Sequence, residues 1–592
     1  MKALKLRWDL KIHKLVMSTE SNRYKLVIAM DFGTTFSGCH VLSLMADPVS
    51  NCDMSMWRFK NEQTTMFYKK RSKKLFALGK LATNEYETNP SSGYYVTKVK
   101  LWLDRTIKED LPSLPHKMTP VQKSYDNFTV IADYLRQMHK SVCQEIRIEY
   151  PNFTDLSMYR YCMAVPTMWS EQSKQIMKEA AVLAGIIKKR DDSEKLLIVD
   201  EAVAAALHAE SKSSDIELTN GSIYMVCDAG GGTVDLATFE KDHSVGENGI
   251  KELTMGTGSS CGSAFLETRF EDLVKEHTLK YPGYNKIILA FVMEYFATSL
   301  KRRFGDRDKE DTYMIDHINK EYNNGHEDDS DYKEFSLDEI RTIVFDPIVD
   351  KILGMIEKQF EQLGGRSLDV MFITGGFGQS PYLQKRIKDT FADRVKHFEI
   401  PVLSYKAVME GAALFGANPR VITQRILRRT YGIKMCSATD KSDNDTGTPS
   451  KRDQFYVCVR KGSPVNEDTW ITKKIAWNKN ILPIISLYAY DGDEPIPEYP
   501  TIQEIDLVSV FNTKFPLDQK RETSYEIMAM KMRFGLDKIE IRVNIAGREF
   551  EYVTVWDVTG EKKTQNFTEP NPPFSVKLKK WFLMEEIVKH LP

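Results

Sequence analysis

Short apolar runs that stop at or near Asp, Gly or Pro recur along the first 420 residues, a pattern typical of buried strands that lead into tight turns. They occupy residues 26–30, 161–165, 196–199, 223–227 and 368–373. Longer stretches with helical spacing lie between them, at 170–185 and 337–363. Ser336 and Glu339 form a capping box that marks the start of the second helix. The alternation predicts an α/β fold with some strands buried on both faces.

The pattern changes after about residue 421, where short segments predict strands at 454–460, 485–489, 539–545 and 550–555. Two polar stretches, at 305–333 and 437–454, predict solvated loops. We expect an N-terminal extension at 1–23, an α/β domain at 24–420 and a smaller β-rich domain at 421–592. After these strands, helical spacing returns only at 581–590, so we expect the β-rich domain to lack a long helical lid.

Length and composition agree with a globular chain of several domains. The 592 residues exceed the roughly 250 to 300 at which single cores stop growing, and 42% are hydrophobic and 28% charged. A net charge of -1 gives no basic footprint for nucleic acid or an anionic membrane, and no run approaches the roughly 20 apolar residues of a membrane span. The start lacks the apolar core of a secretory signal, and the eight cysteines form no CxxC pair. We expect a cytoplasmic protein with reduced thiols.

One motif occurs twice: an apolar strand, an Asp, and then glycines and threonines. The first copy, DFGTTFSG, occupies residues 31–38, and the second, DAGGGTVD, occupies residues 228–235. Glycines let backbone amides approach a phosphate without a Cβ in the way, and threonine hydroxyls add donors. Aspartates at strand ends can hold the waters of Mg²⁺, which keeps much of its hydration shell. Two such hairpins facing each other would hold a triphosphate from both sides. Neither a P-loop nor a Rossmann glycine motif is present.

Three further motifs accompany the hairpins. They are DEAVAAA at 200–206, TGGFGQSP at 374–381 and AVMEGAA at 407–413. In this order, over residues 25–419, the five motifs resemble those of the seventy-kilodalton heat-shock ATPases of the actin and hexokinase superfamily. The form of the TGGFGQSP motif, together with MRFG at 532–535, looks most like the divergent heat-shock 70 kDa protein 12-like branch.

The resemblance implies a two-lobed actin-like fold with duplicated ribonuclease-H-like halves. It implies that ATP or ADP and Mg²⁺ bind in a cleft between the lobes and that ATP is hydrolysed slowly. It also implies that the nucleotide state is coupled to chaperone-like binding of protein partners. By the same resemblance, the phosphate contacts are Gly33, Thr34, Thr35, Gly230, Gly231, Gly232 and Thr233.

The catalytic residues that the resemblance implies are Asp31, Lys100, Glu201, Asp228, Thr233 and Asp235. Asp31 and Asp228 would organise hydrated Mg²⁺ and, with Asp235, the attacking water. Glu201 would lie near that water and Lys100 near the γ-phosphate, with Lys98 as the alternative lysine. The implied nucleoside contacts are Lys301, Arg302, Gly375, Gly376, Phe377 and Gln379.

Several positions depart from the family. Ala202 stands where a connecting proline is usual, Thr298 where a glutamate meets the ribose, and Gln379 where an arginine lies over adenine. The segment TQRILRR at 423–429 replaces an acidic, leucine-rich linker. We therefore expect the phosphates to dominate affinity and selectivity between ATP and GTP to be weak. We expect the β-rich domain to bind protein partners without clamping peptides.

Three other functions fit parts of the sequence. GSSCG at 258–262 matches the elbow of serine hydrolases, with Ser260 as nucleophile and His277, His317, His326 or His397 as its base. The related ATPases, however, carry a glycine-rich loop at this point. A small-molecule kinase of the same superfamily would share the hairpins but does not predict a C-terminal β domain. A nucleotide-gated scaffold without productive turnover is not distinguished from a slow ATPase by the sequence.

Overall fold

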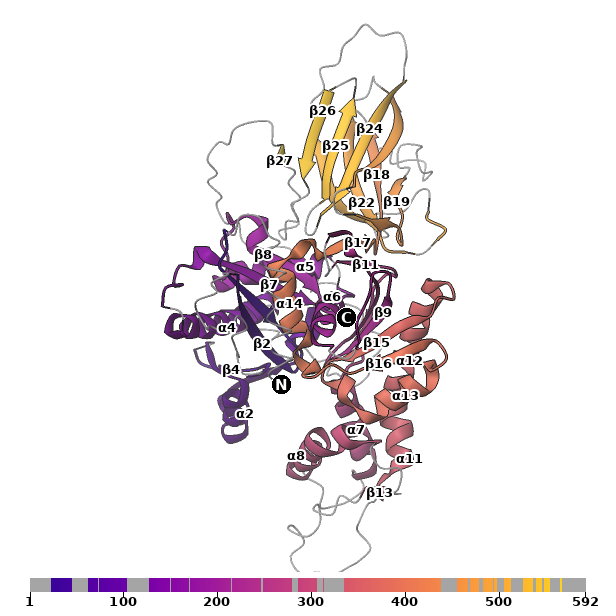
Figure 1. The fold of residues 1–592 in the computed structure, drawn as a ribbon. Helices are drawn as coiled ribbons and strands as arrows, with labels where there is room; N and C mark the ends of the chain where they lie inside the picture. The colour runs from indigo at the N-terminus through magenta and orange to yellow at the C-terminus, as the bar shows by residue number, and fades with distance from the viewer. Residues whose placement is uncertain are drawn as a thin grey trace, which may run out of the picture.

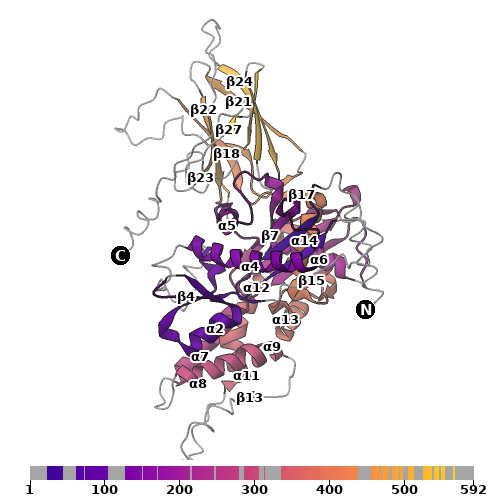
Figure 2. The ribbon, with the colours of Figure 1, turned by 90° about the vertical axis from the view of Figure 1, so that its left-hand side faces the viewer.

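The computed structural model describes residues 23–566 apart from 45–61, 104–126, 279–285, 306–311, 314–334, 438–454, 498–504, 513–524, 554–564 and several gaps of one to four residues. Two α/β lobes lie side by side, and a β-rich part stands at one end of them (Figure 1; Figure 2). The predicted helix at 581–590, and most of the two polar stretches and of the N-terminal extension, lie outside the described residues. Within the described residues every helix is too short or too polar to span a bilayer.

The first lobe is built on a five-stranded sheet in the order β3-β2-β1-β7-β8. Its strands are β1 (Leu26–Asp31), β2 (Phe36–Ser43), β3 (Glu62–Gln63), β7 (Tyr159–Val165) and β8 (Leu196–Asp200). β1 is antiparallel to β2 and parallel to β7, which is parallel to β8. The apolar runs predicted β1, β7 and β8, which the structure confirms. They did not predict β2.

A small sheet and several helices complete this lobe. They are β4 (Thr65–Lys69), β5 (Leu75–Leu78), β6 (Gly93–Thr97), α2 (Gly79–Thr88), α4 (Asn127–Glu149), α5 (Glu171–Ala184), α6 (Glu201–Lys212), and the short turns η1 (Pro90–Ser92), η2 (Val99–Leu103), η3 (Leu156–Met158) and η4 (Ser193–Lys195). The predicted helix at 170–185 corresponds to α5 and is confirmed.

The second lobe is built on an eight-stranded mixed sheet. Its sheet has the order β16-β15-β9-β10-β11-β17-β20, and β12 also pairs with β10. The strands are β9 (Ile223–Ala229), β10 (Val234–Lys241), β11 (Ile250–Glu252), β12 (Thr257–Ser259), β15 (Leu368–Thr374), β16 (Val395–Glu399), β17 (Ile422–Ile426) and β20 (Pro464–Val465). β9 is antiparallel to β10 and parallel to β15, which is parallel to β16. The predicted strands at 223–227 and 368–373 are confirmed as β9 and β15.

Most helices of this lobe cover the outer face of its sheet, whereas α14 (Ala407–Ala417) lies against α6 and packs on β1, β2 and β7 of the first lobe. The other helices are α7 (Ser263–Thr278), α8 (Lys286–Tyr295), α9 (Lys301–Arg303), α11 (Leu337–Ile340), α12 (Asp346–Leu363) and α13 (Pro381–Phe391). Shorter pieces are η5 (His243–Val245), η6 (Phe296–Leu300), η7 (Arg341–Phe345), η8 (Phe377–Gln379), η9 (Ser404–Lys406), η10 (Pro419–Val421), β13 (Thr312–Tyr313) and β14 (Phe335–Ser336).

Alternate residues of the central strands face different cores, as the two-residue period of a strand requires. Leu26 and Ile28 of β1 pack with α4 and α5, whereas Val27 between them packs with α6 and α14. Tyr224 and Val226 of β9 reach the same α6 and α14 core from the second sheet. These two helices therefore form a layer between the sheets (Figure 1). The central strands are buried on both faces, as predicted.

The predicted helix at 337–363 is confirmed with one local change, a π-helical turn (η7) between α11 and α12. Pro347 has no N–H to donate to the carbonyl of Ile343, and Arg269 Nη1 donates to that carbonyl instead at 3.2 Å. The π turn thus lies where proline interrupts the helical hydrogen bonds. At the start of the helix, Glu339 N donates to Ser336 Oγ at 3.0 Å, the first half of the expected capping box.

The β-rich part contains two sheets, ordered β19-β18-β22-β23 and β21-β24-β25-β26-β27. Its strands are β18 (Thr430–Ser437), β19 (Tyr456–Val459), β21 (Ile471–Asn478), β22 (Pro483–Tyr490), β23 (Ile505–Asn512), β24 (Tyr525–Phe534), β25 (Ile539–Ile545), β26 (Arg548–Val553) and β27 (Gln565–Asn566). Ile433, Leu487, Met530 and Ile541 join the two sheets in one core. Although β17 follows the predicted boundary near Val421, it pairs with β11 of the second lobe.

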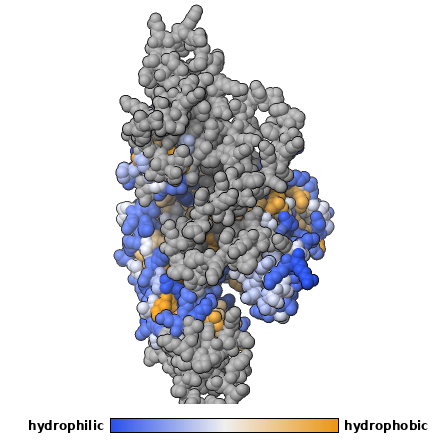
Figure 3. Space-filling model, turned by 180° about the vertical axis from the view of Figure 1, so that it is seen from behind, coloured by the Kyte–Doolittle hydropathy of each residue, from blue (hydrophilic) through white to orange (hydrophobic). Residues whose placement is uncertain are grey.

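The surface agrees with a composition that is average for a globular chain. On the coloured part of the face seen from behind, hydrophilic residues predominate and hydrophobic ones form small patches (Figure 3).

The crossing of α6 and α14 sets a strict size limit at one residue. A Cβ on Gly411 would lie 1.7 Å from the carbonyl oxygen of Ala204, whereas a Cβ on Gly354 in α12 would meet no atom within 4 Å. We expect Gly411→Ala to lower the free energy of unfolding of the lobes by about 1–3 kcal/mol or more, because the helices must move apart. Gly354→Ala should raise it by roughly 0.5–1 kcal/mol. Urea unfolding measured by circular dichroism checks both, and equal effects would contradict the close crossing.

Candidate functional site

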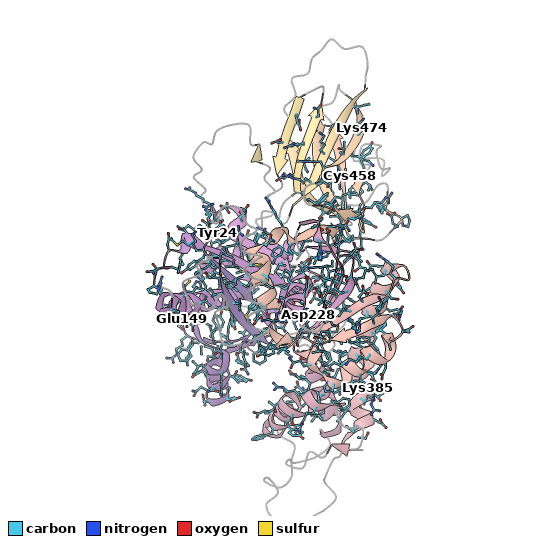
Figure 4. All side chains as sticks on the ribbon, in the orientation of Figure 1. Tyr24, Glu149, Asp228, Lys385, Cys458 and Lys474 are labelled. Atoms are coloured by element: carbon cyan, nitrogen blue, oxygen red, sulfur yellow. The ribbon has the colours of Figure 1, made fainter. Side chains whose placement is uncertain are left out.

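The two glycine hairpins meet at the ends of β1 and β9. A Cβ on Gly231 would lie 2.3 Å from Thr35 Oγ1, and a Cβ on Gly232 would lie 2.0 Å from Thr34 Oγ1. Only glycine allows this approach at either position, so the sequence of the second hairpin is matched to the threonines of the first. The structure therefore brings together predicted phosphate-binding residues from both lobes. Figure 4 shows Asp228 near the middle of the molecule, between Glu149 of the first lobe and Lys385 of the second.

The start of α7 holds the second hairpin in place. The amides of Gly262, Ser263 and Ala264 donate to the carbonyls of Gly232, Gly230 and Gly231 at 3.0, 3.1 and 2.8 Å. These amides are among those that a helix cannot satisfy within its first turn. The contact requires glycine at position 262, because a Cβ there would lie 2.5 Å from the carbonyl carbon of Gly231.

The packing of α7 against the second hairpin explains why position 262, near Ser260, is a glycine. This explanation does not involve a serine nucleophile. Of the histidines considered as its base, His317 and His326 lie outside the described residues, and the side chain of His277 is not described. His397 lies on β16, four strands from β12 across β10, β9 and β15. At a spacing of about 4.8 Å per strand this separation is far beyond hydrogen-bonding reach. The geometry does not support the hydrolase alternative.

A buried ion pair joins Lys100 and Glu201. Lys100 Nζ contacts Glu201 Oε1, and the lysine is 4% exposed. Thr233 Oγ1 lies 3.5 Å from the second oxygen of Glu201, at the limit of a hydrogen bond. Burial alone would lower the pKa of Lys100, but Glu201 and Asp31 outweigh it and raise the pKa above its usual value. The ammonium therefore stays charged in the site.

Of the two lysines considered for this position, Lys100 is the one that pairs with Glu201. Lys98 adopts a left-handed backbone conformation with φ of 56°, which is uncommon for a residue with a side chain. This turn ends β6 and starts η2, which carries Lys100 toward Glu201.

Three aspartates at or near strand ends surround this ion pair. Burial and the charge of Glu201 raise the pKa of Asp228 to about 7, although Thr374 Oγ1 donates to its Oδ1 at 2.9 Å. Burial, opposed by Lys100, raises the pKa of Asp31 to about 7. Burial and Glu201 also raise the pKa of Asp235 well above its usual value. Negative charge is thus in excess in the site.

The two carboxylate oxygens of Asp235 differ in their hydrogen bonding. Its Oδ1 accepts a hydrogen bond from the amide of Thr167 at 2.6 Å. Its Oδ2 is buried and has no hydrogen-bond partner within the described part of the chain. Buried oxygens are normally hydrogen-bonded, so this oxygen is suited to accept a hydrogen bond from a water or a ligand. Sequence reasoning did not find Thr167, and it named Thr374 only as the first residue of the TGGFGQSP motif, without its contact to Asp228.

The residues present fit a hydrated magnesium ion better than a directly bound one. Among the described residues no group of three or more His, Cys, Asp or Glu side chains is arranged to bind a metal. Mg²⁺ usually keeps several waters, and through them the carboxylates of Asp31, Asp228 and Asp235 could hold it. A divalent cation would also relieve the excess negative charge.

The predicted nucleoside residues lie in two groups. Gly375, with φ of 82°, packs against the carbonyl of Ala229, so this turn touches the second hairpin. Gly376 and Gln379 are exposed beside it, and Gln379 Nε2 lies 3.4 Å from Ser404 Oγ. Phe377 differs from its predicted role, because its ring is 3% exposed and packs in the core of the second lobe. A ring contact with a nucleoside does not fit this burial.

The second group lies at the end of the helix that begins with α8. Lys301 Nζ forms an ion pair with Glu267 at 2.6 Å, and Arg302 is exposed next to it. Thr298, in the π-helical turn η6, donates its hydroxyl to the carbonyl of Glu294 in its own helix at 2.7 Å. Its hydroxyl hydrogen is thus already used.

Comparisons with known proteins place this site in context. No protein-family model matches the chain. Heat shock 70 kDa protein 12A of Mus musculus is 25% identical over 510 residues, which cover 70% of this chain and 73% of that protein. Heat shock 70 kDa protein 12B of Homo sapiens is 24% identical over 507 residues, covering 71% and 72%. Chaperone protein DnaK of Carsonella ruddii (strain PV) is 22% identical over 501 residues, covering 80% and 78%.

Among solved structures, MreB5 of Spiroplasma citri bound to ADP is 17% identical, with a TM-score of 0.42, and the match covers 66% of this chain and 96% of that one. The sequence matches confirm the class of protein that the motifs predicted, one that resembles the seventy-kilodalton heat-shock proteins. Within that class the chain is similar to heat shock 70 kDa proteins 12A and 12B, as the form of its motifs predicted.

The raised pKa of Asp228 predicts how stability depends on pH. A carboxyl whose pKa rises from 3.8 to about 7 on folding contributes stability below pH 4 that is lost as the pH rises through 7. Asp228→Asn removes this loss. We expect the variant to gain stability over the nucleotide-free wild type as the pH rises from 4 to 7, by at most about 1.4 kcal/mol per pH unit, and the gain to level off above pH 7. Urea unfolding of both proteins at four pH values measures this, and a pH-independent difference would contradict the raised pKa.

Proposed function

We propose that the protein binds ATP with Mg²⁺ between its two lobes and hydrolyses it slowly. The observation that carries the proposal is the contact of the two hairpins, Thr34 and Thr35 of one against Gly231 and Gly232 of the other. Around this contact lie one buried lysine and several carboxylates with raised pKa values. A triphosphate with a divalent cation matches both the donors and the charge of such a site.

The strand arrangement supports an actin-like architecture. The order β2-β1-β7-β8 in the first lobe and β10-β9-β15-β16 in the second have the same strand directions. We infer that the lobes are duplicated ribonuclease-H-like halves, with α6 and α14 between them, in an ATPase domain over residues 24–420. Each half then supplies one hairpin to the nucleotide.

The side chains have distinct roles in this proposal. Gly33, Thr34 and Thr35, with Gly230 to Thr233, would bind the phosphates through amides and hydroxyls. Mg²⁺, when bound, neutralises phosphate charge, and Asp31 and Asp228 would hold it through water. Lys100, kept charged by Glu201, would lie against the terminal phosphate.

Asp235 is suited to accept a proton from the attacking water. Its Oδ1 is fixed by the amide of Thr167, while its buried Oδ2 has no partner within the described residues. Burial raises the pKa of Asp235 well above its usual value, which makes this carboxylate a stronger base than an exposed aspartate. The phosphate donors and this base together would favour hydrolysis over binding alone.

We also propose that the β-rich domain, residues 421–592, binds protein partners in a way that depends on the nucleotide. On the outer face of β24, Ile527 is 62% exposed. Arg533 of the same strand lies 5.1 Å from the ring of Trp470, and Arg542 of β25 lies 4.5 Å from it. Arginine and tryptophan side chains are enriched at protein interfaces.

The proposal predicts how two substitutions change turnover. Asp228→Asn removes a charge from the magnesium side of the site, and Thr233→Ala removes a hydroxyl from the second hairpin. Losing one group aimed at the developing charge commonly lowers kcat about 10²- to 10³-fold. Phosphate release under single-turnover conditions measures the effect, with Gly354→Ala in α12 as a matched control that should keep the wild-type rate.

Unchanged turnover in both variants would exclude these residues from the mechanism. ATP binding by the wild type without any turnover would instead favour the nucleotide-gated scaffold. Phosphate transfer to a sugar or polyol would favour the kinase.

A further inference from the structure

Two adjacent arginines lie at the junction between the lobes and the β-rich part, and they point to opposite sides of it. They follow β17, which pairs with β11 of the second lobe, and precede β18, the first strand of the β-rich part (Figure 1). Arg429 Nη2 donates to Asp491 Oδ2 at 2.8 Å, just after β22 of the β-rich part. Arg428 Nη1 instead reaches the first lobe, where it lies 2.6 Å from Asp200 Oδ2.

Arg428 contacts two neighbours of the proposed hydrolysis site. Asp200 ends β8 and directly precedes Glu201, which pairs with Lys100. The same Nη1 atom donates to the carbonyl oxygen of Thr167 at 3.1 Å. The amide of Thr167 in turn donates to Asp235 Oδ1 at 2.6 Å. The Arg428 guanidinium thus contacts Asp200, the residue directly before Glu201. It also contacts Thr167, whose amide binds Asp235.

Residues of the second lobe also fix the position of Arg428. A Cβ on Gly256 would lie 3.2 Å from Arg428 Nη2 and 2.7 Å from Thr167 Cγ2, so there is no spare room between the lobes at this point. Glu252 of β11 is buried and accepts a hydrogen bond from the amide of Ile426 at 2.9 Å. The backbone that carries Arg428 is therefore anchored to the second lobe while its side chain binds the first.

The charges around Arg428 are complementary. Burial would raise the pKa of Asp200, but Arg428 and Lys174, whose Nζ lies 3.2 Å from Asp200 Oδ1, lower it to about 2. Arg428 also favours the charged form of Glu252, although burial raises the pKa of that carboxyl. Removing the guanidinium would leave two carboxylates at the junction with less compensation.

We propose that Arg428 is a positioning residue through which the β-rich domain sets the geometry of Glu201 and Asp235. The proposal rests on the hydrolysis proposed above. Any displacement of the β-rich domain that moves the chain between β17 and β18 also moves Arg428. Through its contacts, this displacement shifts Asp200 and Thr167. The nucleotide site and the partner-binding domain are then linked by this side chain, in a segment whose sequence departs from the family's linker.

The test compares Arg428→Gln with Arg429→Gln, which removes the neighbouring arginine on the opposite side of the junction. We expect Arg428→Gln to lower kcat for ATP about 10- to 100-fold, as a small misplacement of reacting groups does, and to change KM by less than about threefold. Arg429→Gln should leave both constants within about twofold of wild type. Arg428→Lys keeps the charge but not the planar fork, so it should recover only part of kcat. Equal loss of kcat in the two glutamine variants would overturn the proposal.

A double-mutant cycle shows whether Arg428 acts through Asp200. Asp200→Asn should reproduce the loss of kcat, and the double variant should be no worse than the more affected single variant, because both changes break one contact. Additive losses would overturn that route. If Arg428→Gln does not fold, Arg428→Lys and Asp200→Asn carry the comparison.

Hydrogen exchange separates a failure of this inference from a failure of the proposed hydrolysis. In the full-length, nucleotide-free chain, amides at residues 167–169 should exchange faster in Arg428→Gln than in wild type and Arg429→Gln, whether or not the protein turns over ATP. Unchanged exchange there would show that Arg428 does not hold Thr167, even if the wild type is an active ATPase. If exchange is faster in Arg428→Gln but the wild type does not turn over ATP, Arg428 orders this loop and its role in catalysis is overturned.

Discussion

The contact between the two glycine–threonine turns determines what the rest of the molecule has to provide. Gly232 and Gly231 approach the hydroxyls of Thr34 and Thr35 so closely that a Cβ at either position would lie 2.0 or 2.3 Å from them. Each turn lies at the end of a strand in a different lobe, so the two sheets have to be held in fixed proximity. The packing of α6 against α14 achieves this, and the glycine of α14 at position 411 allows the backbones to touch.

The same proximity concentrates negative charge. Asp31 and Asp228 come from different lobes, and each has a pKa raised to about 7 because the site is buried and Glu201 lies nearby. Lys100 offsets only part of this charge. Proteins commonly give up stability at functional sites in this way. The groups that repel each other in the free protein are those whose charge a bound ligand can compensate. The electrostatic cost is thus in keeping with a site for a cation and a polyphosphate.

The sequence predicted the parts of the fold that depend on local pattern. Unbroken apolar runs identified β1, β7, β8, β9 and β15, and the paired motifs identified both hairpins. The hairpin partners β2 and β10 were not predicted, because serine, threonine, glycine or charged residues interrupt their apolar positions. The π turn before Pro347 was also not predicted, because it depends on a distant contact, the hydrogen bond from Arg269 to the carbonyl of Ile343.

The candidate site could be predicted only where backbone chemistry requires a residue type. Glycines at the turns and aspartates at the strand ends carry such a requirement, and Lys100 was selected from two neighbouring lysines. Phe377 was expected at the nucleoside, but the sequence could not show that its ring turns into the core. The contacts of Arg428 join residues more than 200 positions apart, and no local pattern predicts such contacts.

The most direct test of the central claim is calorimetric titration of the full-length protein with ATP at about pH 8, with Mg²⁺ and then with a chelator. The hairpin geometry and the excess of carboxylates predict one ATP per chain with micromolar or weaker affinity in Mg²⁺, and a large loss of affinity without the metal. No binding with Mg²⁺ at millimolar ATP, or equal affinity with and without the metal, would contradict a magnesium–triphosphate site between the lobes.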